Sequence, residues 1–341
     1  MSETFRPSTL GEILDRTAQI YRRKFWLFAG VAALPIGAIV ALSALAATIW
    51  RAFFRSVSFD NFEMNGTLAI LFIGVVLVGI PLYIAAVVFS YAGLTQAAAS
   101  AHRGEAITIR SALGAVKPHF WRYLWFIILQ GFIVGVLPGS AAALAIGILI
   151  ALAAAAGGGA ASVAAGFIAV LVGIAAAVVI IWFALSYSLG LPVCVVEIKS
   201  AWESMQRSWK LSSGTRARIF VMYLLVMALS VALSMVAAIP FLIIITVSTS
   251  MGNGAANSST AVVVAEIVRV IVDFLLQVLL APISVIALVL FYYDQRIRKE
   301  GFDIEWMMQQ AGLTQTTSNA QATGILETSA PVAPPDTVEE P

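Results

Sequence analysis

Long apolar runs separated by short polar segments dominate this sequence. An α-helix needs about twenty apolar residues to cross the hydrocarbon core of a bilayer. Runs of at least that length lie at residues 25–50, 68–97, 121–155, 163–193, 219–248 and 263–293. The pattern therefore predicts an all-α integral membrane protein with six transmembrane helices.

Prolines inside the runs predict kinks. Proline removes a backbone hydrogen-bond donor and clashes with the preceding turn of a helix. These prolines are Pro35, Pro81, Pro138, Pro240 and Pro282. The third run is the longest and contains the sequence LPGS at 137–140, so we expect a break in the helix there.

Lysine and arginine are unevenly distributed among the connecting segments. Residues 155–162 and 249–262 contain neither, and residues 51–67 contain only Arg51 and Arg55, whereas the other connections and both flanks are basic. The positive-inside rule then places both termini in the cytoplasm. The predicted organisation is a cytoplasmic interfacial helix at 1–24, a six-span domain at 25–293, a charged cytoplasmic segment at 294–312 and a disordered polar tail at 313–341.

Three of the basic segments share one helical pattern with spacing i, i+4, i+7, i+11, which marks one face of a helix. The residues are Leu10, Leu14, Thr17 and Tyr21; Ile109, Leu113, Val116 and Phe120; and Ile198, Trp202, Met205 and Trp209. Thr9 with Glu12 and Ser200 with Glu203 fit the capping box at a helix start. We expect these amphipathic helices to lie in the membrane interface.

Each of these helices precedes two spans, which indicates a threefold repeat of one interfacial helix and two spans. The second span of each unit ends in a similar way, so Tyr91, Tyr187 and Tyr292 would occupy matching positions. An even number of spans per unit keeps every copy in the same orientation. The repeat therefore predicts an axis along the membrane normal.

Composition agrees with a lipid environment and limits the chemistry. Hydrophobic residues make up 60% of the chain and charged residues 11%, against about 25% in an ordinary soluble domain. A net charge of +2 does not indicate a nucleic-acid partner, and the one cysteine, Cys194, lies in an apolar stretch that favours a buried thiol. The sequence contains no recognisable catalytic or metal-binding motif, so we expect neither enzymatic activity nor a cofactor.

One group of polar residues falls inside the last apolar run. Glu266, Arg269 and Asp273 are spaced i, i+3 and i+7 on one helix face, and Gln277 follows one turn later. Ionisable groups in lipid are costly, so they are usually paired or face a cavity. The group is either a self-neutralising cluster at the outer interface or, with Gln277 and Gln130, a polar pocket for an ion or headgroup.

A second group follows the last run, where the chain becomes densely charged. Basic residues there suit both the C-terminal carbonyls of a helix and the anionic phospholipid headgroups of the cytoplasmic leaflet. The interleaved acidic residues instead suggest docking onto the other basic helices or onto a protein partner. The candidate docking residues are Tyr292, Asp294, Arg296, Arg298, Lys299, Glu300 and Asp303.

Two stretches near the ends of the chain carry a family resemblance. Residues 6–26, RPSTLGEILDRTAQIYRRKFW, and 292–306, YYDQRIRKEGFDIEW, resemble the two ends of a bacterial membrane family named the glycerophosphoryl diester phosphodiesterase membrane domain. The resemblance implies a multi-span fold in the cytoplasmic membrane of a bacterium. Members of that family can be fused to a soluble catalytic barrel, but this chain has no room for one, so no catalytic residue is carried over.

Two functions fit these features. The first is a non-catalytic membrane protein that organises a partner or lipids, supported by the concentrated cytoplasmic charge. The second is a carrier or channel-like protein for a lipid-related solute, supported by the repeat, the prolines and the Glu266, Arg269 and Asp273 group. Phosphodiesterase activity is the least supported alternative.

Overall fold

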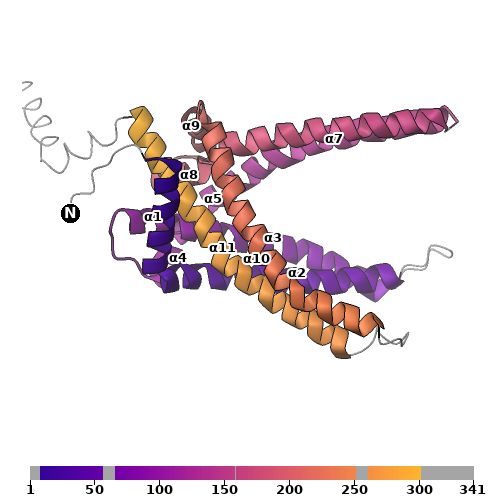
Figure 1. Ribbon diagram of the computed structural model, residues 1–341, viewed down its shortest axis with the longest axis horizontal. Helices are drawn as coiled ribbons and strands as arrows, with labels where there is room; N and C mark the ends of the chain where they lie inside the picture. The colour runs from indigo at the N-terminus through magenta and orange to yellow at the C-terminus, as the bar shows by residue number, and fades with distance from the viewer. Residues whose placement is uncertain (1–7, 57–65, 158, 251–259, 301–341) are drawn as a thin grey trace, which may run out of the picture. The chain divides into compact units, whose positions relative to one another are not determined.

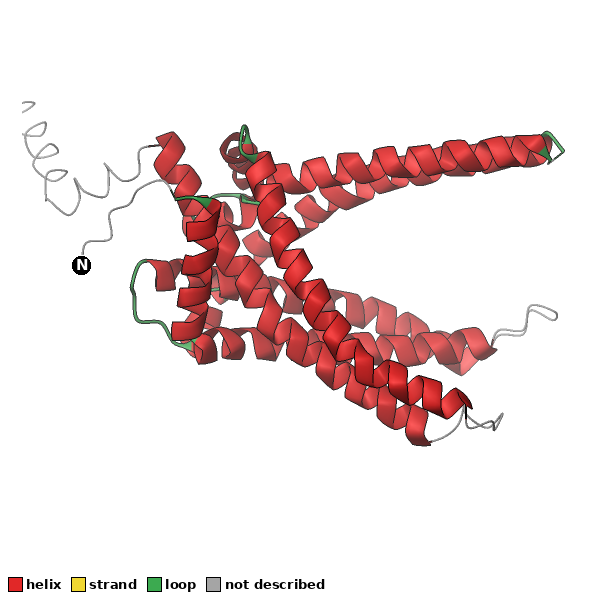
Figure 2. Cartoon of the chain, viewed as in Figure 1, coloured by secondary structure: helices red, strands yellow, loops and turns green. Residues whose placement is uncertain are grey.

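The computed structural model describes residues 8–56, 66–157, 159–250 and 260–300, and within these ranges the secondary structure is entirely helical (Figure 2). The contacts form one compact unit from residues 8–293 and a second from the two ends, of which residues 294–300 are described. The helices are α1 (Leu10–Arg23), α2 (Phe25–Ser56), α3 (Gly66–His102), α4 (Ile109–Gly114), η1 (Lys117–His119), α5 (Phe120–Gly131), η2 (Phe132–Val136), α6 (Leu137–Ala155), α7 (Ala160–Tyr187), α8 (Gly190–Val196), α9 (Ala201–Ser212), α10 (Arg216–Ser250) and α11 (Thr260–Glu300) (Figure 1).

The prediction of an all-α protein with six candidate membrane spans is confirmed for the described residues. Each span is long and apolar enough to cross a bilayer. The spans are Phe25–Arg51, Phe72–His102, Ile109–Ala155, Ala160–Val196, Arg216–Ile239 and Ile267–Glu300. The tail at 313–341 lies outside the described residues.

The third run does not break at its proline as the sequence suggested. The π-helical turn η2 joins α5 to α6, and Pro138 follows it in the first turn of α6. Within a continuous helix proline cannot donate to the preceding turn, and a π turn is one way in which the helix adapts to that loss. The wider π turn absorbs the disturbance, so the chain stays helical from Phe120 to Ala155.

Three short helices begin with the same cap. The side chains of Thr9, Thr108 and Ser200 each accept a hydrogen bond from the backbone N–H three residues later, and the side chain at that later position accepts one back. The predicted boxes at Thr9 and Ser200 are thus confirmed, and Thr108 with Ser111 forms a third that was not predicted. Each cap satisfies amides that the first turn leaves without partners.

The residues predicted to share one apolar face on each of these helices do so only in part. The face of the second helix is interrupted, because α4 ends at Gly114 and a turn with the 3₁₀ helix η1 intervenes before α5. In α9, Met205 is buried beside Ser204 and Ser208, whereas Trp202 is 57% exposed. Small serines let α9 approach its neighbours closely, so the buried stripe follows size as well as apolarity.

A buried core lies among α3, α5, α8 and α9. Phe126, Cys194 and Met205 are all fully or almost fully buried there, which confirms the burial of the cysteine. Helices α6 and α7, by contrast, pack against each other and expose large apolar side chains along much of their length. Such exposure is costly in water and is accommodated in lipid.

Three basic side chains connect the short helices in cyclic order. Lys24, just before α2, donates to the carbonyl of Glu105 ahead of α4 at 3.2 Å. Arg122, at the start of α5, donates to the carbonyl of Ile198 ahead of α9 at 3.0 Å. Arg218, at the start of α10, donates to the carbonyl of Ser8 ahead of α1 at 3.0 Å. In each case a basic side chain at the start of a span is hydrogen-bonded to the segment that precedes the next short helix.

Candidate functional site

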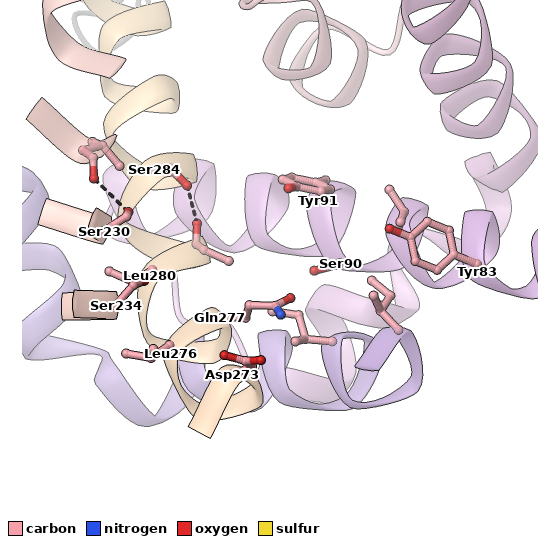
Figure 3. Close-up of a pocket in the computed structure, with 15 residues that line it drawn as sticks. Tyr83, Ser90, Tyr91, Ser230, Ser234, Asp273, Leu276, Gln277, Leu280 and Ser284 are labelled. Atoms are coloured by element: carbon pink, nitrogen blue, oxygen red, sulfur yellow. Dashed lines mark hydrogen bonds between the residues drawn. The ribbon is translucent and has the colours of Figure 1, made fainter. Parts of the chain in front are cut away.

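A cavity of about 460 Å³ lies among α2, α3, α10 and α11 (Figure 3). All four helices carry candidate membrane spans. Its lining residues are Ile36, Ile39, Tyr83, Val87, Ser90, Tyr91, Val226, Ser230, Ser234, Asp273, Leu276, Gln277, Leu280, Ala281 and Ser284. Such a volume and such a mixture of apolar walls with a few polar groups are typical of small-molecule sites.

Helix α11 supplies the most polar wall of the cavity. Asp273 and Gln277 are one turn apart, so both side chains fall on the same face, and both line the cavity (Figure 3). Arg269 Nη1 lies 3.4 Å from Asp273 Oδ2, and the two side chains are 49% and 47% exposed. The carboxylate is therefore both paired with a cation and open to the cavity.

Serine hydroxyls add acceptor groups to the lining. Ser230 Oγ donates to the carbonyl of Val226 at 2.8 Å, and Ser284 Oγ donates to the carbonyl of Ala281 at 2.9 Å. Each hydroxyl proton is thus used within its own helix. The oxygen of each serine keeps lone pairs that can accept a hydrogen bond from a bound molecule.

Helix α3 contributes Tyr83, Ser90 and Tyr91 to the lining, and Figure 3 shows them across from Asp273 and Gln277. Ser90 is only 3% exposed, whereas both tyrosines are partly exposed. A phenol can donate or accept a hydrogen bond. Polar groups from helices far apart in sequence therefore meet around one space.

The structure places only some of the predicted intramembrane residues at the cavity. Asp273 and Gln277 line the cavity, and Arg269 pairs with Asp273 without being one of the lining residues. The side chain of Glu266 lies outside the described residues. Gln130 is not part of the lining, since its Nε2 donates to the carbonyl of Tyr187 at 3.3 Å.

Sequence reasoning did not find the other polar lining residues. Tyr83, Ser90, Ser230, Ser234 and Ser284 are single polar positions in apolar runs. Single serines of this kind are common in membrane helices because their hydroxyls bond to the preceding turn. That these residues line one cavity becomes apparent only when α3, α10 and α11 are packed together.

The candidate docking residues are held largely by interactions within the protein. Tyr292 is fully buried, so its side chain is not exposed to a protein partner. Arg298 Nε lies 2.9 Å from Asp294 Oδ2, and Arg296 Nε lies 3.2 Å from Glu300 Oε2, both as i, i+4 pairs along α11. Asp303 lies outside the described residues, and Lys299 is near the end of α11.

Glu197 is the centre of a polar network between α8 and α9. Its carboxylate accepts a hydrogen bond from Tyr292 at 2.7 Å and forms salt bridges with Arg207 and, at 3.3 Å, with Lys199. Burial alone would raise the pKa of this carboxyl, but the bonds from Tyr292 and Arg207 outweigh burial and lower the pKa. Glu197 is therefore held ionised.

Tyr293 forms a comparable link on the next position of α11. Its hydroxyl accepts a hydrogen bond from Arg103 Nη1 at 3.2 Å, and Arg103 also binds Glu105. That bond from Arg103 lowers the pKa of the Glu105 carboxyl. The adjacent tyrosines thus join α11 to two different connecting segments, one after α3 and one after α8.

The chemistry of the cavity and of these networks is the basis for inferring what the protein does. Neither a protein-family model, nor a curated protein, nor a solved structure matches this chain. The resemblance of residues 6–26 and 292–306 to the glycerophosphoryl diester phosphodiesterase membrane domain stays a prediction.

Proposed function

We propose that this protein binds an amphiphilic, lipid-related solute in the cavity among α2, α3, α10 and α11, and acts as a carrier for it. One observation carries the proposal: hydroxyl, amide and carboxylate groups from three helices line one cavity within the candidate membrane spans. The setting we propose is the cytoplasmic membrane of a bacterium, with both termini in the cytoplasm.

The physical support is the cost of polar groups in lipid. A carboxylate within a membrane span is unfavourable unless it is paired or faces a polar space. Asp273 has both a partner, Arg269, and a cavity that also contains Gln277 and Ser90. Apolar walls such as Ile36 and Leu276 suit a hydrocarbon chain, and the polar wall suits a headgroup.

The predicted threefold repeat supports a carrier role. The three capping boxes and the cyclic bonds from Lys24, Arg122 and Arg218 are arranged as three related units would be. Many carriers are built from repeated units that rock against one another around a site within the membrane. We propose the repeat on this basis, with α1, α4 and α9 as the helices that begin each unit.

The alternative role, organising a partner or lipids at the membrane, rests on the charged end of α11. There the described charges already pair within the helix, as Asp294 with Arg298 and Arg296 with Glu300. Such i, i+4 pairs are weak and do not by themselves exclude a partner or a lipid headgroup. The cavity, which the organising role does not require, is the observation that favours the carrier.

Native mass spectrometry of the protein extracted gently from its membrane tests the proposal. We expect excess mass from a retained lipid or amphiphile. Ser230→Leu should abolish the retained mass because it fills the cavity, whereas Ala228→Leu adds similar bulk to an exposed position of the same helix and should leave it unchanged. Equal retention by both variants, or no retained molecule in the wild type, would contradict the proposal.

A further inference from the structure

Building on the proposed function, we infer that the preferred solute is an amphiphile with a cationic ammonium headgroup. The inference rests on the signs of the charges and the directions of the hydrogen bonds in the cavity. Asp273 and Gln277 supply acceptor oxygens from α11, and Ser230 supplies one from α10. The cavity thus presents acceptors where a headgroup would sit.

The charges around the cavity favour a cationic headgroup. Of the fifteen residues that line the cavity, Asp273 is the one carboxylate, and none is lysine, arginine or histidine. A phosphate headgroup would therefore meet a negative group without a cation among its lining neighbours. An ammonium would meet a carboxylate of opposite sign, to which it is attracted.

The directions of the serine hydrogen bonds also favour a headgroup that donates. Because Ser230 and Ser284 donate their protons to Val226 and Ala281, their oxygens can act towards a ligand only as acceptors in this arrangement. An ammonium group carries three donors and no acceptor. Asp273, Gln277 and Ser284 follow one another along α11, so the acceptors are spread along this wall of the cavity (Figure 3).

The Arg269 pair leaves room for such a ligand. Its contact with Asp273 measures 3.4 Å, which is longer than the roughly 2.7–2.9 Å of a strong charge-assisted hydrogen bond. Asp273 is also about half exposed, at 47%. An ammonium at closer range would therefore compete well for the carboxylate.

Three probes with the same chain and different headgroups test this inference: dodecylamine, dodecanol and dodecyl phosphate. Each is added at the same concentration to the full-length protein in a nonionic detergent, and the bound fraction is measured by native mass spectrometry. We expect dodecylamine to bind at least about tenfold more tightly than dodecanol, as a charged hydrogen bond predicts, and dodecyl phosphate to bind least.

Two substitutions locate the preference. Asp273→Asn keeps the size of the side chain and removes its charge, so it should reduce the preference for the amine about tenfold while dodecanol still binds. Arg269→Gln removes the competing cation and should preserve or increase the preference. If Asp273→Asn does not fold, the relative affinities of the wild-type protein for the three probes still test the headgroup preference.

The outcomes separate this inference from the function on which it rests. Binding that Ser230→Leu abolishes but that shows no preference for dodecylamine, or favours dodecyl phosphate, overturns the ammonium headgroup and leaves the cavity as a binding site. An amine preference that survives Asp273→Asn also overturns it. If none of the three probes binds, or if Ser230→Leu leaves their binding unchanged, the binding function itself is overturned.

Discussion

The hydroxyl of Tyr292 donates a 2.7 Å hydrogen bond to Glu197 Oε1, across 95 positions of the sequence. Tyr292 is fully buried, and the Glu197 side chain is mostly buried beside Arg207 and Lys199. The bond connects α11 to the segment between α8 and α9. A residue that the sequence suggested for docking thus belongs to the internal structure of residues 8–293.

Removing that bond should weaken the fold. Tyr292→Phe deletes a donor to a charged acceptor, a type of bond worth about 1.5–3 kcal/mol, and we expect the low end because Arg207 still pairs with Glu197. Tyr21→Phe is a matched control, since Tyr21 donates to the neutral carbonyl of Leu279 at 3.0 Å. Thermal unfolding in detergent should show the larger loss for Tyr292→Phe, and equal losses would contradict the charged role of Glu197.

Acid should destabilise the protein partly through Glu197. Its folded pKa is lowered from the ordinary value of 4.5, so its contribution is fully present above that value and is lost as the pH falls through the folded pKa. Glu197→Gln should lower the melting temperature at neutral pH and flatten its decline in acid. Glu105→Gln, at a more exposed pair with Arg103, should change the acid profile less. An unchanged acid profile in Glu197→Gln would refute this assignment.

Gly190 is required by its contact with a buried ring. A Cβ at this position would lie 2.6 Å from Phe126 Cζ, and Phe126 is fully buried in the core. Gly190→Ala should therefore cost about 1–3 kcal/mol of unfolding free energy through overpacking. Gly147→Ala in α6 meets nothing within 4 Å and should be neutral or slightly stabilising. Unfolding in mixed micelles compares the two, and a neutral Gly190→Ala would show that Phe126 can move aside.

Arg216 contacts two tryptophan rings that lie nearly perpendicular to each other. Its guanidinium carbon lies 4.7 Å from the ring centroids of both Trp182 and Trp209. Lysine keeps the charge but cannot stack as a plane, so Arg216→Lys should cost about 1 kcal/mol and shift the tryptophan fluorescence. Arg110→Lys, at an exposed position of α4, should change neither quantity. Identical behaviour of the two variants would exclude a stabilising stack at Arg216.

Local features of the fold were predictable from the sequence because their causes are local. A run of about twenty apolar residues must be helical in lipid, since every backbone group needs a partner within the segment. The caps at Thr9 and Ser200 were predictable for the same reason, because a hydroxyl and a carboxylate three residues apart satisfy the first amides. The π turn at Phe132–Val136 was not predictable, since a proline pattern does not say how a helix will adapt.

Which side chains meet was decided by the tertiary structure. The spacing of Asp273 and Gln277 indicated a polar face on α11, but only packing places Ser90 of α3 and Ser230 of α10 around the same cavity. Likewise, Tyr91, Tyr187 and Tyr292 hold similar places in the sequence, yet Tyr91 lines the cavity, Tyr187 stacks on Phe183, and Tyr292 is buried. The sequence determined that apolar helices would form in lipid, because that depends on each segment alone. The cavity and its charge depend on contacts of α11 with α2 and α3, which lie far away in the sequence, and only the assembled fold specifies those contacts.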